Sequence, residues 1–240
     1  MIAEFSAGKI VNDSFKLYLK NFVPLFTITF LCCIPLFAAS GYFTATGEIL
    51  SNPFRSAGVL LAISLIVTPL STGALTHSVY QSLRSKPVSV GESLSVGLRR
   101  FAPVLGVAIC TMLFVIAGCI LLLIPGLILA CLLYVASPVC VVEKKGVFES
   151  MQRSRTLTSG RKWQIFVIMF GINLLMGIVG RIVEMAAPTS EGQAYLMLGV
   201  QFFIQTITAG WNATAAALSY YHLRSIHESV DIEDIAAVFD

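Results

Sequence analysis

The sequence has few charged residues, and this shortage decides its class. Asp, Glu, Lys and Arg make up only 12% of the 240 residues, whereas 56% are hydrophobic. A water-soluble domain carries about 25% charged residues, because its surface must face water. The shortage excludes a soluble globular protein and indicates a chain that lies largely within a membrane. We therefore expect one all-α membrane domain over residues 1–240.

The sequence also lacks the short motifs that carry catalysis. It contains no G-x-S-x-G nucleophile elbow, no H-E-x-x-H zinc motif, no P-loop and no paired carboxylates within its apolar segments. Acid–base chemistry needs titratable groups, which are scarce here. We predict that the protein is not an enzyme and has no cofactor, and we keep a membrane enzyme acting on lipids only as a third hypothesis.

The cysteines are not placed for a metal site or a redox motif. They form no C-x-x-C motif and are not paired with His at metal-ligand spacing. All six fall within apolar segments: Cys32, Cys33, Cys110, Cys119, Cys131 and Cys140. We interpret them as small hydrophobic residues of the protein interior and expect no bound metal.

Long apolar segments predict six membrane-spanning helices, since about 20 residues cross the hydrocarbon core. The predicted spans are residues 22–47, 57–82, 101–123, 126–142, 163–186 and 194–221. The apolar stretch 101–142 is too long for one span, and the turn signal Pro125-Gly126 divides it into an antiparallel hairpin. Residues 222–240 form a tail, in which Asp231 is expected to cap a short helix.

The basic residues are distributed unevenly between the two ends of these spans. Of the 16 Lys and Arg residues, only Arg55 and Arg181 fall on one side, and all others fall on the other side. The positive-inside rule then predicts cytoplasmic N and C termini, which agrees with an even number of spans. The polar, amphipathic start of the chain predicts insertion by the first span rather than by a cleaved signal peptide.

Three segments that precede spans share a layout. Each has an acidic residue, Ser and an apolar residue, followed by basic and aromatic residues and a span, and they begin at Asp13, Glu92 and Glu149. We expect three short elbow helices in the membrane interface, each followed by a two-span hairpin. This layout predicts a threefold pseudo-repeat of the hairpin unit, with chance matching of common residue types as the alternative.

The second elbow carries the clearest helix signals. Ser89 and Glu92 fit a capping box at its start. Val90, Leu94 and Leu98 share one helical face. We expect this apolar face to lie against the membrane interface.

A family resemblance rests on the stretch 124–163. It contains the sequence IPG at 124–126, a span end PVCVVE at 138–143 and the loop RSRTLTSGRKW at 153–163. These motifs resemble those of the bacterial YciC-like membrane proteins and of the related membrane domain attached to some glycerophosphodiester phosphodiesterases. The resemblance implies a six-span inner-membrane protein. The 240 residues hold no soluble phosphodiesterase domain, so that domain's catalysis is not carried over.

The candidate functional residues are mostly basic and flank spans on the predicted cytoplasmic side. They are Arg99, Arg100, Glu143, Lys144, Lys145, Arg153, Arg155, Arg161, Lys162 and Trp163. Basic loops suit anionic lipid headgroups, and a Trp favours the headgroup level. The alternative interpretation is that these charges only set the topology. Glu143 is expected to bind the basic loop 150–160 and fix the third elbow, which is a structural role.

Two functions follow from these features. The leading hypothesis is a non-enzymatic membrane protein that supports envelope organisation by contacting anionic phospholipids, membrane protein partners or further copies of itself, and no nucleic acid. The alternative is a small-solute transporter or transporter subunit, which a water-accessible cavity lined by Thr, Asn and Gln near the midplane would favour. The polar residues Asn173, Gln201, Gln205 and Asn212 are interpreted as contacts between helices.

Overall fold

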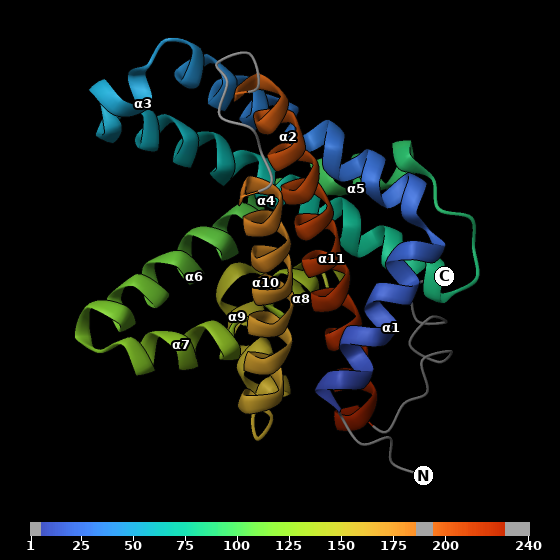
Figure 1. Ribbon diagram of the computed structural model, residues 1–240. Coiled ribbons are helices and arrows are strands. Elements are labelled where there is room, and N and C mark those ends of the chain that lie inside the picture. The colour runs from blue at the N-terminus through green and yellow to red at the C-terminus, as the bar shows by residue number, and fades with distance from the viewer. Residues whose placement is uncertain (1–5, 186–193, 229–240) are drawn as a thin grey trace.

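The computed structural model describes residues 6–185 and 194–228, and these residues form helices and no strand, as the all-α prediction requires (Figure 1). The helices are α1 (Ala7–Lys20), α2 (Phe22–Ala45), α3 (Glu48–Ser51), α4 (Pro53–Leu83), α5 (Val90–Arg99), α6 (Phe101–Leu121), α7 (Leu123–Leu132), α8 (Ala136–Val142), α9 (Val147–Thr158), α10 (Lys162–Met185) and α11 (Ala194–Glu228). Alternating long apolar and short amphipathic segments produce this order.

Three long hairpins diverge from a common base (Figure 1). Helix α2 packs on α4, α6 packs on α7, and α10 packs on α11. The short helices α1, α5 and α9 each precede one hairpin. We call the end of the bundle that holds these three short helices the base, and the opposite end the hairpin ends.

Five segments of the described chain are long and apolar enough to cross a membrane. They are Phe22–Ala45, Pro53–Leu83, Phe101–Leu121, Leu123–Val142 and Lys162–Met185. The protein is therefore an integral membrane protein. Helix α11 is not among the five, because Gln201, Gln205 and Asn212 make it less apolar. It packs against α1, α2, α4 and α10, so much of its surface faces protein rather than lipid.

The short base helices connect neighbouring hairpins. Helix α5 packs on α4, α9 packs on α8, and α1 packs on α11, so the first base helix contacts the last hairpin. Each base helix carries a fully buried serine, namely Ser14, Ser93 or Ser150. Ser14 accepts a hydrogen bond from Nε1 of Trp211 on α11 (3.1 Å), and Ser93 accepts one from the hydroxyl of Ser78 on α4 (2.8 Å). Small polar side chains thus join the hairpins at the base.

The second base helix starts as predicted, and its smallest residues face α4. The Ser89 hydroxyl accepts a hydrogen bond from the Glu92 backbone N–H (3.5 Å) and caps α5. Leu98, expected on the apolar face, is 68% exposed, whereas Ser93 and Gly97 are buried against α4. The crossing of α5 and α4 is too close for a leucine, so the smallest residues occupy it.

The turn between α6 and α7 lies at Leu122 and not at Pro125-Gly126, which corrects the predicted span limits 101–123 and 126–142. Leu122 is extended (φ −164°, ψ 143°) between the two helices. Pro125 lies in the first turn of α7, where a missing N–H costs little. A Cβ on Gly126 would lie 2.8 Å from the backbone nitrogen of Cys119 on α6. The glycine is therefore needed for close helix packing rather than for the turn.

The predicted continuous span 126–142 is interrupted at residues 133–135. Pro138 has no N–H to bond the carbonyl of Tyr134, and its ring clashes with that carbonyl, so a new helix starts two residues before the proline. The carbonyl of Leu132, at the end of α7, accepts hydrogen bonds from the hydroxyls of Ser154 (2.8 Å) and Thr158 (3.2 Å) on α9. The break is thus satisfied by a neighbouring helix, as backbone at membrane depth requires.

Other boundaries differ for local reasons. Helix α4 begins at Pro53 rather than at 57, since proline suits the first helical position. Helix α11 continues to Glu228, so the predicted tail 222–240 begins inside the helix, whose last turns are held by contacts with α8 and α9. The predicted helix after Asp231, like the final residue of the span 163–186, lies outside the described residues.

The close crossing of α4 and α5 yields a stability test. A Cβ on Gly97 would lie 2.8 Å from the carbonyl oxygen of Leu70 and 3.0 Å from the backbone nitrogen of Ala74. We expect Gly97→Ala to lower the free energy of unfolding by about 1–3 kcal/mol, since the helices must move apart. Gly91→Ala on the same helix meets nothing within 4 Å and should be neutral or stabilising. Thermal unfolding in detergent that ranks the two variants equally would contradict this packing.

Candidate functional site

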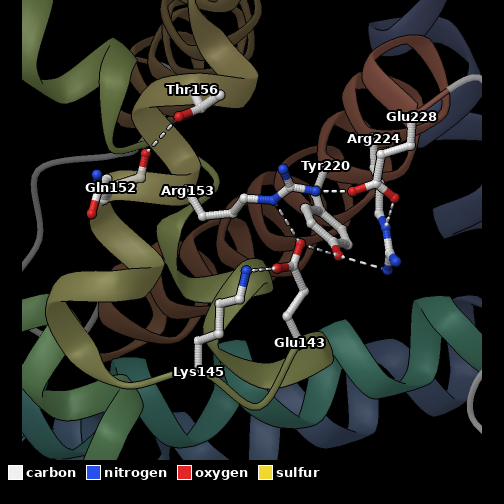
Figure 2. Close-up of polar contacts among 8 residues, drawn as sticks. All are labelled: Glu143, Lys145, Gln152, Arg153, Thr156, Tyr220, Arg224 and Glu228. Atoms are coloured by element: carbon white, nitrogen blue, oxygen red, sulfur yellow. Dashed lines mark hydrogen bonds and ion pairs between the residues drawn. The ribbon is translucent and has the colours of Figure 1, made fainter.

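Glu143, the residue that follows α8, is the centre of a polar cluster at the base (Figure 2). Its carboxylate is only 9% exposed and accepts hydrogen bonds from Nζ of Lys145 (2.6 Å), Nε of Arg153 (3.2 Å) and the hydroxyl of Tyr220 (3.1 Å). Arg153 belongs to α9 and Tyr220 to α11. One carboxylate therefore joins the end of α8 to two other helices.

A second carboxylate extends this cluster along α11. Arg153 also pairs with Glu228, and Nε of Arg224 donates to Glu228 (2.8 Å). Nη1 of Arg224 donates to the Tyr220 hydroxyl (3.2 Å), and that hydroxyl donates in turn to the Glu143 carboxylate. These contacts form a closed circuit of two arginines, two carboxylates and one tyrosine, and Lys145 adds a third cation at Glu143. The circuit fixes the relative positions of α8, α9 and α11.

The electrostatics of the cluster keep Glu143 ionised. Burial alone would raise the pKa of this carboxyl group, because a charge is costly away from water. The hydrogen bond from Lys145 and the charge of Arg153 outweigh burial, so the pKa of Glu143 lies below its ordinary value. The carboxylate thus serves as a permanent anion that holds cations, which suits a structural role and not a proton-transfer role.

The other predicted site residues are not brought into this cluster. Arg99, Lys144, Arg155 and Lys162 are exposed. Arg100 and Arg161 are half-buried. Trp163 is 73% exposed and stacks on Phe166. Of the ten predicted residues, Glu143, Lys145 and Arg153 converge on one another.

Three members of the cluster were not predicted. Tyr220, Arg224 and Glu228 follow each other at intervals of four residues, so they lie on one face of α11. The four-residue spacing indicates a shared polar face of the helix. The local sequence does not indicate which distant acidic or basic side chain that face contacts. The predicted end of the span at residue 221 also separated them, because it placed Glu228 in a tail.

A cavity of about 1050 Å³ lies among α2, α4, α11 and the break between α7 and α8. Its lining residues, all from the described chain, include hydroxyl, amide and apolar side chains but no charged one. The polar lining includes Thr68, Ser71, Ser137, Gln201, Gln205 and Asn212. A volume of this size is at the upper end of ligand sites, which range over about 300–1,000 Å³.

The chemistry of this lining restricts what the cavity holds. A charged ligand buried without an opposite charge is strongly disfavoured away from water. Neutral hydroxyls and amides instead pair with neutral oxygen and nitrogen groups. Within residues 6–185 and 194–228, no three His, Cys, Asp or Glu side chains gather as a metal site. The cavity is therefore suited to an uncharged organic molecule.

Comparisons with protein-family models, with curated proteins and with solved structures find no match for this chain. The resemblance to YciC-like proteins stays a prediction. Function is therefore inferred from the polar cluster and the cavity alone.

The depressed pKa of Glu143 yields a pH-dependent stability test. A carboxyl group whose pKa is lower in the folded state stabilises the fold above its unfolded pKa of about 4.3, and this stabilisation is lost as the pH falls through the folded value. Glu143→Gln should cost about 1.5–3 kcal/mol at neutral pH, the range for hydrogen bonds to charged groups. The difference from the unsubstituted protein should shrink on acidification below about pH 4.3.

Thermal unfolding across this pH range in nanodiscs measures the effect. Glu184→Gln is the control, because Glu184 forms an exposed pair with Arg181 on α10 (2.7 Å) and should change stability little at any pH. An equal loss in both variants, or a loss in Glu143→Gln that persists at low pH, would show that the ionised carboxylate does not hold the base.

Proposed function

We propose that the protein is a non-enzymatic, six-span membrane protein that binds an uncharged molecule in the cavity among α2, α4, α8 and α11 and serves its movement across or along the bilayer. The cavity carries this proposal. It is large, it is lined by Thr, Asn and Gln side chains, and it is surrounded by membrane-spanning helices. These are the features that favour a transporter over a purely structural membrane protein.

The sixth span in this proposal is α11. It has 35 residues, more than the roughly 20 that cross a membrane, and it packs against α2, α4 and α10. Six spans place both termini on one side, and the excess of basic residues there makes that side the cytoplasm. The three buried serines Ser14, Ser93 and Ser150 in equivalent base helices support a threefold pseudo-repeat.

The cavity is closed toward the base and lies nearer the hairpin ends. Its lining comes from residues 33–40 of α2, 60–72 of α4 and 198–216 of α11. Below it, the base is filled by buried Val139, Leu223 and Tyr221 and by the Glu143 cluster. This asymmetry supports access from the side of the hairpin ends, which the proposed topology places outside the cytoplasm.

Cys33 provides a native probe of this access, because its side chain lines the cavity. In a protein whose only cysteine is Cys33, neutral N-ethylmaleimide should react at a measurable rate that burial of the thiol limits. A charged methanethiosulfonate should be kept out because burying its charge is costly. Ser64 lines the cavity on the α4 side, so Ser64→Trp should narrow the cavity and slow the maleimide reaction at Cys33 severalfold.

A matched protein that keeps only Cys119 is the control. Cys119 is exposed on α6 and does not line the cavity, so Ser64→Trp should leave its maleimide rate unchanged. A Cys33 rate that Ser64→Trp does not alter would mean that small neutral molecules do not reach Cys33 through the cavity, and the proposed function would fall.

A second candidate function is contact with anionic lipid headgroups at the base. The exposed side chains of Arg99, Lys144, Arg155 and Lys162 favour it, since they form no ion pair within the described part of the chain. The exposed aromatic rings of Trp163 and Phe148 suit the headgroup level.

A fourfold Gln variant of Arg99, Lys144, Arg155 and Lys162 tests this contact. Each basic residue near an anionic surface contributes about 1 kcal/mol, so retention of phosphatidylglycerol over phosphatidylcholine, followed by native mass spectrometry, should fall strongly. Arg153 must stay, because its loss would break the Glu143 cluster. The double variant Arg55→Gln and Arg181→Gln at the opposite end is the control, and equal retention in both variants would exclude the contact.

A further inference from the structure

The hydroxyl of Tyr134 is a buried group without a partner at the edge of the cavity. Tyr134 lies in the non-helical turn between α7 and α8 and lines the cavity. Its hydroxyl oxygen is buried and forms no hydrogen bond with any described residue. A buried hydroxyl without a partner is costly, and such groups in native proteins are rare. The hydroxyl therefore lacks an acceptor among the described residues, and a ligand meets it when the Tyr134 ring turns toward the cavity that the residue lines.

The break in the helix explains why this donor is held in place. Non-helical backbone at membrane depth is tolerated where it is buried or lines a cavity, and transport proteins bind ligands at broken helices. Here Ser154 and Thr158 of α9 already satisfy the Leu132 carbonyl, and Pro138 prevents the helix from continuing through the break. The turn that carries Tyr134 is thus fixed from outside the cavity.

The polar groups of the lining fall into two sets. The hydroxyls of Ser40, Ser64 and Ser71 donate to carbonyls of their own helices, so toward a ligand they can act only as acceptors. By contrast, the side chains of Ser137, Gln201 and Gln205 form no hydrogen bond with described residues, as is also true of the Tyr134 hydroxyl. Tyr134 comes from the break, Ser137 lies in the first turn of α8, and the two glutamines lie one turn apart on α11.

The remaining wall of the cavity is apolar. Leu36 and Phe37 of α2 face Leu198 and Phe202 of α11, and the rings of Phe37 and Phe202 lie with centroids 4.3 Å apart. One cavity therefore offers unpaired polar groups together with an aliphatic and aromatic surface. Neither part includes a charge among the described residues that line it.

We infer that the cavity binds an uncharged amphiphile, whose hydroxyl, ether or ester oxygen accepts a hydrogen bond from Tyr134 while its hydrocarbon part lies along Phe37 and Phe202. This inference rests on the proposed function and names its ligand class. The amides of Gln201 and Gln205 pair with a second oxygen of the same polar group. An ionised amphiphile is rejected, because its charge would have no partner in the cavity.

The test uses the full chain in nanodiscs of dioleoylphosphatidylcholine with two photoactivatable probes. One is a diazirine-labelled monoacylglycerol, which is uncharged, and the other is the fatty acid of the same chain. Labelling is done at about pH 9, where the fatty acid is ionised even though the bilayer raises its pKa. The monoacylglycerol should label peptides that include residues 134–138 and 201–206. An excess of unlabelled monoacylglycerol should displace it, and an excess of fatty acid should not.

Tyr134→Phe removes only the hydroxyl, and Tyr42→Phe, at an exposed tyrosine of α2, is the matched control. Tyr134→Phe should reduce cavity labelling severalfold without lowering the unfolding temperature, since the hydroxyl bonds to no described residue. A structural role would instead lower the unfolding temperature. Equal labelling of the two variants, or equal labelling by the fatty acid, would overturn the inference.

The outcomes separate this inference from the proposed function. If N-ethylmaleimide reaches Cys33 through the cavity but the monoacylglycerol does not label it, the cavity admits neutral molecules and the amphiphile inference alone falls. If Cys33 is reached at a rate that Ser64→Trp does not change, both proposals fall.

Discussion

The contact of α9 with the end of α7 and the end of α8 is the interaction on which the rest of the structure depends. It satisfies the Leu132 carbonyl at the helix break through Ser154 and Thr158. At the far end of α8, the same helix α9 holds Glu143 through Arg153. In a membrane no water is available to solvate such groups, so the protein itself must pair them. The same short amphipathic helix thus keeps the base closed and fixes the floor of the cavity.

The sequence predicts the features that depend on local chemistry. Apolar length indicates the five segments that are suited to cross the membrane, and the cap at Ser89 marks the start of α5. The sequence also predicts that Glu143 binds the basic loop 150–160, because a carboxylate at a span end needs a cation as its partner. The hydrogen bond from Tyr220 of α11 to Glu143 is not predictable in this way, because it depends on how distant helices pack.

The errors in the sequence-based prediction come from residues with more than one use. Gly126 after Pro125 indicates a turn, but it serves a close contact with Cys119. Of the polar residues interpreted as contacts between helices, Asn173 and Asn212 do bond each other between α10 and α11 (3.5 Å), whereas Gln201 and Gln205 line the cavity. Only the angles between helices decide whether such a residue meets a neighbour or a space.

The central claim is that a closed base supports an uncharged cavity that takes up a ligand. An experimental structure by electron cryomicroscopy, of protein extracted into nanodiscs with its own membrane lipids, tests this most directly. The account predicts density for an uncharged, elongated molecule that ends at Tyr134, above an intact Glu143–Arg153 contact. A cavity that is filled by the side chains of α2 and α11, or that holds a charged headgroup, would contradict it.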